Sequence, residues 1–133
     1  MAKTRKNKTK NKTKTNAWGY HLIVNAGLCN PTALRSKATL TTFAKQLVKD
    51  INMKAYGPPH VYRFGEGTLL GLSMFQLIET SNITVHCDET RNDVYLDIFS
   101  CKWFEKEAAL KLIRSTFSPT HLDYTFMARQ AKH

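Results

Sequence analysis

Residues 69–101, LLGLSMFQLIETSNITVHCDETRNDVYLDIFSC, hold three apolar segments that are separated by two short polar turns. The segments are Leu69–Ile78, Asn82–Cys87 and Asp93–Ser100, and each has the length of a β-strand. The second turn, Asp88–Asn92, is wholly polar. Consecutive strands joined by such short turns pair side by side and run in opposite directions. This stretch therefore predicts the centre of an antiparallel sheet.

Further strands and two helices are predicted on either side of this stretch. Short strands are expected at Gly19–Val24, His60–Phe64 and Leu122–Phe126. Apolar residues recur at three- and four-residue spacing in 32–52 and again in Trp103–Phe117, which predicts two amphipathic helices. Two helices packed on one face of a mainly antiparallel sheet form a two-layer α/β sandwich, which is an α+β fold.

Length and composition limit the class of protein. The chain has 133 residues, of which 42% are hydrophobic, so one domain with a real core is expected. No segment approaches the roughly 18 apolar residues of a membrane span, and no apolar segment follows the Lys-rich start, as it would in a secretory signal. Cys29, Cys87 and Cys101 are an odd number without CxxC spacing, which disfavours a disulfide framework and a four-cysteine zinc site. We therefore expect a reduced, cytoplasmic setting without a membrane anchor.

The net charge of +10 is concentrated at the N-terminus. Residues 1–16 hold seven of the twenty Lys and Arg residues and no acidic residue, which leaves an ordinary +3 for residues 17–133. With no large apolar side chain beyond Met1, the segment 1–16 is predicted to be a disordered basic tail. Either a solubilising tail or a salt-sensitive polyanion tether fits this composition. The domain itself, 17–133, does not have the charge of a nucleic-acid binder.

Five polar residues interrupt the apolar strands or stand where a strand ends: Ser73, Thr80, Ser81, His86 and Cys101. A serine, a histidine and a cysteine on neighbouring strands have the side chains of a nucleophile, a base and a proton donor. The same residue types also occur as ordinary hydrogen-bonded or packed core side chains. No G-x-S-x-G, Walker or H-E-x-x-H motif is present, so the pattern alone leaves both interpretations open.

The spacing of these residues resembles that of the short, bacterial-type S-adenosylmethionine decarboxylases. Members of that family have a serine eight residues before the serine at which they cleave themselves, a histidine five residues after it and a cysteine twenty residues after it. Ser73, His86 and Cys101 stand at these distances from Ser81. This family also begins with a Gly-x-His-Leu strand and ends a later strand with Asp-hydrophobic-Phe-Ser/Thr-Cys. The matching residues are Gly19-Tyr20-His21-Leu22 and Asp97-Ile98-Phe99-Ser100-Cys101, and the resemblance covers residues 18–127.

The resemblance implies a proenzyme that cuts its own chain between Thr80 and Ser81. The hydroxyl of Ser81 would attack the carbonyl of residue 80, Ser73 would help to hold the intermediate, and His86 would remove the α-proton. Ser81 would then become a covalent pyruvoyl group, which binds the substrate amine as a Schiff base and accepts electrons when carbon dioxide leaves. Cys101 would return a proton to the product.

The resemblance also implies the partners of the chain. The substrate would be S-adenosylmethionine, and the product would supply the aminopropyl group for spermidine synthesis. The cleaved chains would form a homodimer with a two-layer α/β fold. No metal and no dissociable cofactor are implied.

The chain departs from the family pattern in two places. Glu79 stands one residue earlier than the glutamate that usually precedes the cleavage serine, so Thr80 occupies that position. After His86 the chain continues with residues 87–90, CDET, where bacterial members have Thr-Trp-Pro-Glu. Phe64 resembles an aromatic residue near the nucleoside site, although a core phenylalanine fits that position equally well.

These departures leave two alternatives open. The first is a pyruvoyl-dependent ornithine or arginine decarboxylase, in which Asp88 or Glu89 would contact the distal cation of the substrate. Alternatively, Asp88 and Glu89 are ordinary polar residues of the turn and contact no substrate. The second alternative is an uncleaved, non-catalytic homologue, which is suggested by the β-branched Thr80.

Overall fold

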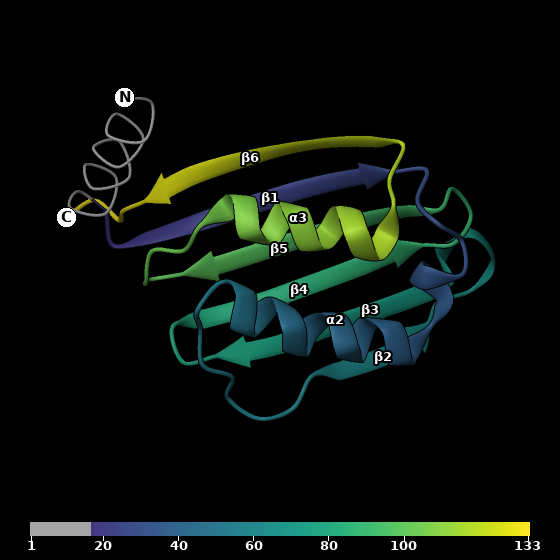
Figure 1. Ribbon diagram of the computed structural model, residues 1–133, viewed down its shortest axis with the longest axis horizontal. Helices are drawn as coiled ribbons and strands as arrows, with labels where there is room; N and C mark the ends of the chain where they lie inside the picture. The colour runs from purple at the N-terminus through teal and green to yellow at the C-terminus, as the bar shows by residue number, and fades with distance from the viewer. Residues whose placement is uncertain (1–16) are drawn as a thin grey trace.

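A computed structural model describes residues 17–133, so the predicted disordered tail 1–16 lies outside the described residues. The strands are β1 (Gly19–Gly27), β2 (His60–Phe64), β3 (Gly71–Ile78), β4 (Ser81–Asp88), β5 (Asp93–Ser100) and β6 (His121–Arg129). The helices are α2 (Lys37–Asp50) and α3 (Lys106–Phe117), with short 3₁₀ turns η1 (Ala33–Arg35) and η2 (Gly67–Leu69). Figure 1 shows the two helices lying along the sheet.

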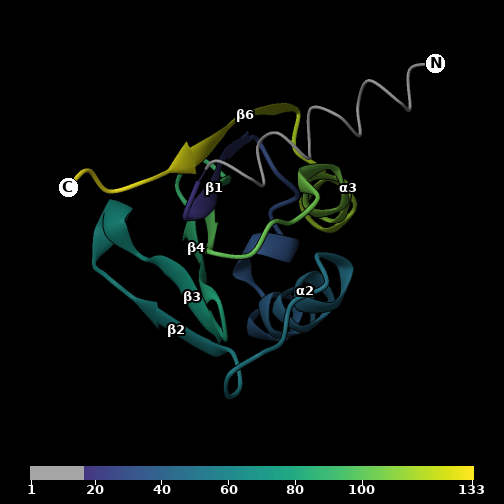
Figure 2. The same ribbon diagram turned by 90° about the vertical axis from the view of Figure 1, so that its left-hand side faces the viewer.

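The six strands form one sheet in the order β2-β3-β4-β5-β1-β6, and every neighbouring pair is antiparallel. Figure 2 shows both helices on one side of this sheet, whereas no helix of residues 17–133 covers its other side. The predicted fold class is therefore confirmed as a two-layer α/β sandwich. Within residues 17–133, neither helix is long and apolar enough to cross a lipid bilayer.

The core lies between the helices and the sheet, and strand alternation decides which side chains enter it. On β3, for example, Leu72, Met74 and Ile78 are buried, whereas Phe75 and Leu77 are exposed on the other face. The helices add Leu40, Phe43, Leu47, Leu110, Ile113 and Phe117 from their apolar faces. The uncovered face, called the open face below, therefore carries the alternate residues of every strand.

The first helix is shorter than the sequence predicts. The periodicity predicts one helix over 32–52, but the structure has η1 followed by α2, with extended backbone at Ser36 between them. The Ser36 hydroxyl accepts a hydrogen bond from the N–H of Thr39 and so caps α2. Apolar spacing alone cannot reveal this break, because residues on both sides of it face the core.

The second helix also begins later than predicted, at Lys106 rather than Trp103. Tertiary packing explains the difference, because the ring of Trp103 packs edge-on against Tyr20, with 5.0 Å between centroids. Glu105 then caps the helix by accepting from the N–H of Glu107.

Two strands are longer than the sequence predicts. The strand β1 continues to Gly27 and β6 continues to Arg129. The strand β1 is extended because Asn25 and Ala26 pair with both β5 and β6, and Gly27 pairs with β6.

Candidate active site

The β3–β4 hairpin holds the predicted cleavage bond. Ile78 and Ser81 face each other in the strand register, so Glu79 and Thr80 form a two-residue turn. Ser81 has a φ of 153°, a backbone conformation that residues other than glycine rarely adopt. Such a conformation costs on the order of 1–3 kcal/mol and persists only where the surrounding structure enforces it. The peptide unit between Thr80 and Ser81 therefore joins a turn to a strained residue.

The neighbouring strand β5 contacts the same peptide unit. Ser100 lies opposite Ser81 in the β4–β5 register, which brings Cys101 beside the hairpin. The backbone N–H of Cys101 donates to the carbonyl oxygen of Thr80 at 2.9 Å. An N–H donor in this position polarises the carbonyl and can stabilise negative charge that develops on its oxygen. The Cys101 side chain is exposed and its thiol is free.

The other predicted pair, Ser73 and His86, lies on the open face. These residues are directly opposite each other in the β3–β4 register. The Ser73 Oγ and the His86 Nδ1 are 2.8 Å apart and form a hydrogen bond. This contact gives the histidine ring a fixed orientation, which is what a base or a proton shuttle requires.

The structure brings the predicted residues together as two groups rather than one. Ser81, Thr80 and Cys101 meet at the end of the sheet, whereas Ser73 and His86 meet in the middle of β3 and β4. Ser81 and His86 are five residues apart on the same strand, which corresponds to about 17 Å in an extended chain. No side chain spans that distance, so the two groups do not act on the same atom within one chain.

A hollow of about 350 Å³ adjoins the Ser73–His86 pair on the open face. It is lined by Ser73 and His86 and by the side chains of Tyr62, Phe64, Phe75, Tyr95 and Asp97, among others. Phe64 lies on the edge strand β2 and is 57% exposed, so it is not the core phenylalanine that the sequence also allowed. Its ring is available to a ligand in this hollow.

Two motif residues that served only as family markers in the sequence form a pair in the structure. His21 Nε2 and Asp97 Oδ1 are 2.9 Å apart on the open face. The His21 ring also packs edge-on against Phe99, with 5.8 Å between centroids. Because Phe99 stands two residues before Cys101, this pair supports the strand end that carries the exposed thiol. Both motifs are visible in the sequence, but the contact between His21 and Asp97 follows only from the β1–β5 register.

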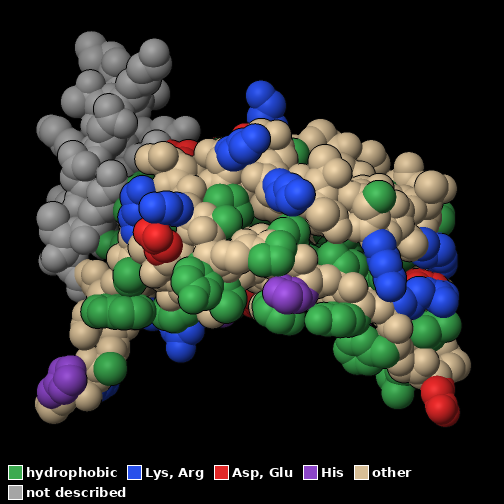
Figure 3. Space-filling model, turned by 90° about the horizontal axis from the view of Figure 1, so that it is seen from below, with side chains coloured by type: hydrophobic (Ala, Val, Ile, Leu, Met, Phe, Trp, Pro, Cys, Tyr) green, Lys and Arg blue, Asp and Glu red, His purple; other side chains and the backbone are tan. Residues whose placement is uncertain are grey.

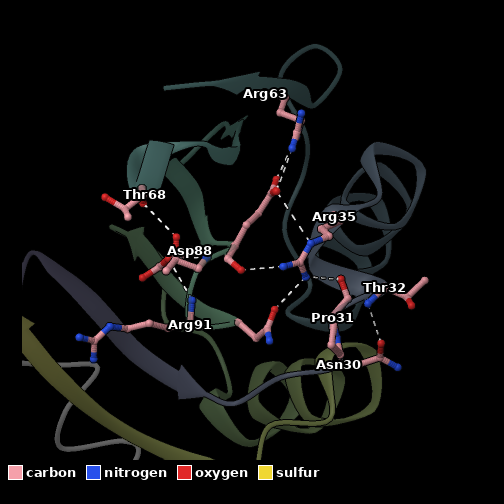
Figure 4. Close-up of polar contacts among 11 residues, drawn as sticks. Asn30, Pro31, Thr32, Arg35, Arg63, Thr68, Asp88 and Arg91 are labelled. Carbon is pink, nitrogen blue, oxygen red and sulfur yellow. Dashed lines mark hydrogen bonds and ion pairs between the residues drawn. The ribbon is translucent and has the colours of Figure 1, made fainter. Parts of the chain in front are cut away.

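The substituted segment after His86 has structural contacts of its own (Figure 4). Asp88 Oδ1 accepts from the N–H groups of Thr90 and Arg91, which is the pattern of an Asx turn. The Glu89 carboxylate accepts two hydrogen bonds from Arg63, at 3.0 and 2.9 Å, and lies 3.8 Å from the Nε of Arg35. The hydrogen bonds from Arg63 lower the pKa of Glu89, and the charge of Arg35 acts in the same direction. Both carboxylates therefore belong to the turn.

The displaced glutamate, Glu79, forms an ion pair at the surface. Glu79 Oε2 lies 3.6 Å from Lys54 Nζ, and both side chains are largely exposed. The three thiols also differ in their surroundings, because Cys29 and Cys87 are buried whereas Cys101 is exposed. Burial raises the pKa of Cys29 to about 11 and that of Cys87 to about 12. These two thiols are therefore packed core side chains.

The fold and the hairpin together define a class of protein: an α/β sandwich that holds a strained serine peptide beside an exposed thiol. Comparison with known families identifies the chain more narrowly than its fold and hairpin do. A family model described as S-adenosylmethionine decarboxylase matches residues 20–130, and the chain belongs to this family of carboxy-lyases, which are made as proenzymes. The family expected from the sequence is thereby confirmed.

Individual relatives agree with this assignment. The chain is 29% identical over 109 residues to an S-adenosylmethionine decarboxylase proenzyme from Pyrobaculum aerophilum, with 81% of this chain and 85% of that protein covered. A proenzyme of the same description from Pyrobaculum islandicum is 28% identical over the same shares of both chains. The crystal structure of the adenosylmethionine decarboxylase from Aquifex aeolicus has the same fold, with a TM-score of 0.73 at 18% identity. That match covers 88% of this chain and 94% of the other.

Proposed function

We propose that this chain is an S-adenosylmethionine decarboxylase that cleaves itself between Thr80 and Ser81. The observation that carries this proposal is the hairpin geometry, in which a strained serine follows a carbonyl that accepts a hydrogen bond from the Cys101 N–H. Strain at Ser81 favours rearrangement of this peptide bond, and the N–H donor stabilises the charge that the rearrangement creates. The family to which the chain belongs consists of proenzymes.

Self-cleavage follows from the side chains of the hairpin and of the Ser73–His86 pair. The Ser81 Oγ attacks the carbonyl carbon of Thr80, and the C–N bond breaks, so the amide becomes an ester and the nitrogen becomes a free amine. His86, held by Ser73, then removes the α-proton of residue 81. The ester C–O bond breaks in this elimination and releases the carboxylate of Thr80. Water hydrolyses the resulting unsaturated residue, ammonia leaves, and a pyruvoyl group remains at position 81.

The residues around Ser81 fit such a group, because its carbon atoms come from the serine itself and the exposed Cys101 is its neighbour. A pyruvoyl carbonyl supplies an electron sink for the loss of carbon dioxide from an α-amino acid. Cys101 holds the proton that replaces the carboxyl group of the substrate. A free thiol is required for this role, which supports a reducing, cytoplasmic location.

We propose further that the working enzyme is a homodimer whose open faces pack against each other. The separation of about 17 Å along β4 means that His86 cannot reach Ser81 in its own chain. A second copy that lies face to face with the first can bring its Ser73–His86 pair to the Ser81–Cys101 end. Each of the two sites then uses residues of both chains.

The surface of the open face supports this arrangement. Its exposed apolar side chains include Tyr62, Phe64, Phe75, Leu77, Tyr95 and Met127, each between 39% and 57% exposed. A patch of this kind is typical of a surface that is buried in an assembly. In Figure 3 the open face lies along the lower margin of the molecule, which is hollowed and carries many hydrophobic side chains. The hollow beside His86 would then lie against the Ser81–Cys101 end of the second chain, with Phe64 in the wall of the substrate site.

The alternative substrate, a basic amino acid, has less support. It needs a free carboxylate in segment 87–90, but Glu89 is already paired with Arg63 and Arg35, and Asp88 caps the turn. The uncleaved homologue is also less favoured, because a chain with no need to react has no reason to keep a strained serine in this turn.

Release of carbon dioxide from carboxyl-labelled substrates tests the proposed activity. The purified protein should release label from S-adenosylmethionine and much less from ornithine or arginine. Protein in which Ser81 is replaced by alanine serves as the control and should release none. Turnover of ornithine or arginine alone would contradict the proposed substrate. No turnover by a fully cleaved protein would contradict the decarboxylase assignment.

A further inference from the structure

The hydroxyl group of Thr80 is bound to a buried partner on β5. Thr80 Oγ1 and Ser100 Oγ are 2.7 Å apart, and Ser100 has no exposed surface. The N–H of Lys102 donates to the same Ser100 oxygen at 3.0 Å. Thr80 Oγ1 also lies 3.4 Å from the sulfur of Met53, which accepts hydrogen bonds weakly. The side chain of residue 80 is therefore part of a small, partly buried network in which Ser100 is fully buried.

The two hydroxyls share one hydrogen bond, in which either oxygen can be the donor. Ser100 Oγ also accepts from the N–H of Lys102. The hydroxyl that does not donate within the pair can donate to the sulfur of Met53, which lies 3.4 Å from Thr80 Oγ1 and 3.8 Å from Ser100 Oγ. In both arrangements the two hydroxyls remain bonded to each other. A buried hydroxyl that lost its partner here would carry a desolvation penalty.

This network holds the Thr80–Ser81 peptide bond in place from the side of β5. Thr80 is held twice by consecutive residues at the end of β5: its side chain by Ser100, the last residue of the strand, and its carbonyl oxygen by the N–H of Cys101, which follows it. Thr80 is β-branched and has few χ1 rotamers, so fixing its hydroxyl also restrains its backbone. The strain at Ser81, the next residue, persists only while the turn cannot relax.

We propose that the Thr80–Ser100 hydroxyl pair is a positioning element for self-cleavage, which keeps the Thr80 carbonyl in place for attack by Ser81. The inference rests on the proposed function, since it concerns the same bond. Neither hydroxyl reacts, and both act through the carbonyl and the strain at Ser81. The pair also gives Thr80, which stands where the family pattern leads one to expect glutamate, a role in the first step of processing.

Formation of the ester at residue 81 tests the pair more directly than activity does. In a His86→Ala background the elimination step is blocked, so the ester accumulates. Neutral hydroxylamine cleaves esters but not ordinary amides, leaving a hydroxamate on Thr80 and a free amine on Ser81. The fraction of chain cut by hydroxylamine, measured by intact mass, therefore reports the first step alone. We expect Thr80→Val and Ser100→Ala each to lower this fraction by roughly fivefold to tenfold, the effect of losing one hydrogen bond.

The controls separate positioning from general stability. Thr80→Ser keeps the hydroxyl and should restore the ester fraction, whereas Thr42→Val removes an exposed hydroxyl on α2 and should leave it unchanged. The double variant Thr80→Val/Ser100→Ala should be no worse than the poorer single variant, because the two hydroxyls act as one unit.

Two results would overturn the inference: ester fractions equal to that of the parent in both single variants, or a lowered melting temperature with an unchanged ester fraction. A wild-type chain that never cleaves, and never forms ester in the His86→Ala background, would refute the proposed function instead.

Discussion

Cys101 contributes to the proposed site at the Ser81–Cys101 end of the sheet in two separable ways. Its backbone N–H binds the Thr80 carbonyl oxygen, and its exposed thiol lies beside the hairpin. The first contribution does not depend on the side chain, whereas the second depends on it entirely. A substitution of the side chain therefore distinguishes processing of the chain from turnover of the substrate.

Cys101→Ala should cleave itself at close to the wild-type rate but turn over substrate at least about 100-fold more slowly, since a positioned proton donor is worth at least that factor. The two rates are measured on the same sample, by intact mass and by release of carbon dioxide. Full turnover by Cys101→Ala would show that the thiol is not the proton donor.

The pairing of Ser73 with His86 is a contact that the sequence could predict once the turn was located. Both residues are equally far from the Glu79–Thr80 turn, so a two-residue hairpin must place them opposite each other. The unusual φ of Ser81 and the network of Thr80 and Ser100 were not predictable in this way. They depend on the β4–β5 register and on a methionine from the segment after α2, which local patterns do not show.

At the scale of elements, one ion-pair cluster joins three parts of the chain that are distant in sequence (Figure 4). Arg35 of η1 donates to the carbonyl oxygen of Glu89, at 2.6 Å, and to the side chain of Asn92, at 2.8 Å. Arg63 of β2 donates to the carboxylate of Glu89. The turn between β4 and β5 is thereby tied to the edge strand and to the segment before α2.

Glu89→Gln should lower the melting temperature by a few degrees at neutral pH, because the two arginines lose their anionic partner. The pKa of Glu89 is lowered in the folded state, so its stabilising effect is present above the ordinary glutamate pKa of about 4.3. The effect is lost as the pH falls through the lower folded-state pKa. Melting curves of wild type and variant between neutral and acidic pH should therefore converge.

Glu66→Gln is a matched control for this measurement, since Glu66 is exposed in the turn before η2. Its melting temperature should follow that of wild type at every pH. A constant difference between Glu89→Gln and wild type down to acidic pH would show that the cluster stabilises the fold by packing rather than by charge.

The elements themselves were largely predictable, but their ends and their order in the sheet were not. Alternation along β3, β4 and β5 was strong because one face of each strand is buried. The position of β1 between β5 and β6, by contrast, depends on pairings across about 75 and 100 residues of sequence. The start of α3 depends on the aromatic contact of Trp103, which no propensity scale contains.

For the whole molecule, the central question is whether one chain or two form the site. In a mixed dimer of a Ser81→Ala chain and a His86→Ala chain, one of the two sites combines the intact Ser81 of one chain with the intact His86 of the other. The His86→Ala chain should therefore be cleaved when the two are co-expressed, although neither chain is cleaved alone. Intact mass distinguishes the chains.

A chain that carries both Ser81→Ala and His86→Ala is the control for this experiment. It has no intact His86 to donate and should not rescue cleavage of the His86→Ala chain. Failure of the Ser81→Ala chain to rescue, in a sample shown to contain mixed dimers, would mean that the proposed face-to-face arrangement is wrong.

The account as a whole depends on one chemical event, the conversion of Ser81 into a pyruvoyl group, and the mass of the freshly purified protein under denaturing conditions tests it directly. Two fragments are expected, one ending at Thr80 and one beginning at residue 81. The second fragment should be lighter than a chain that starts with serine by the mass of one ammonia molecule. A single uncut chain, or a second fragment that retains its amino group, would contradict the account.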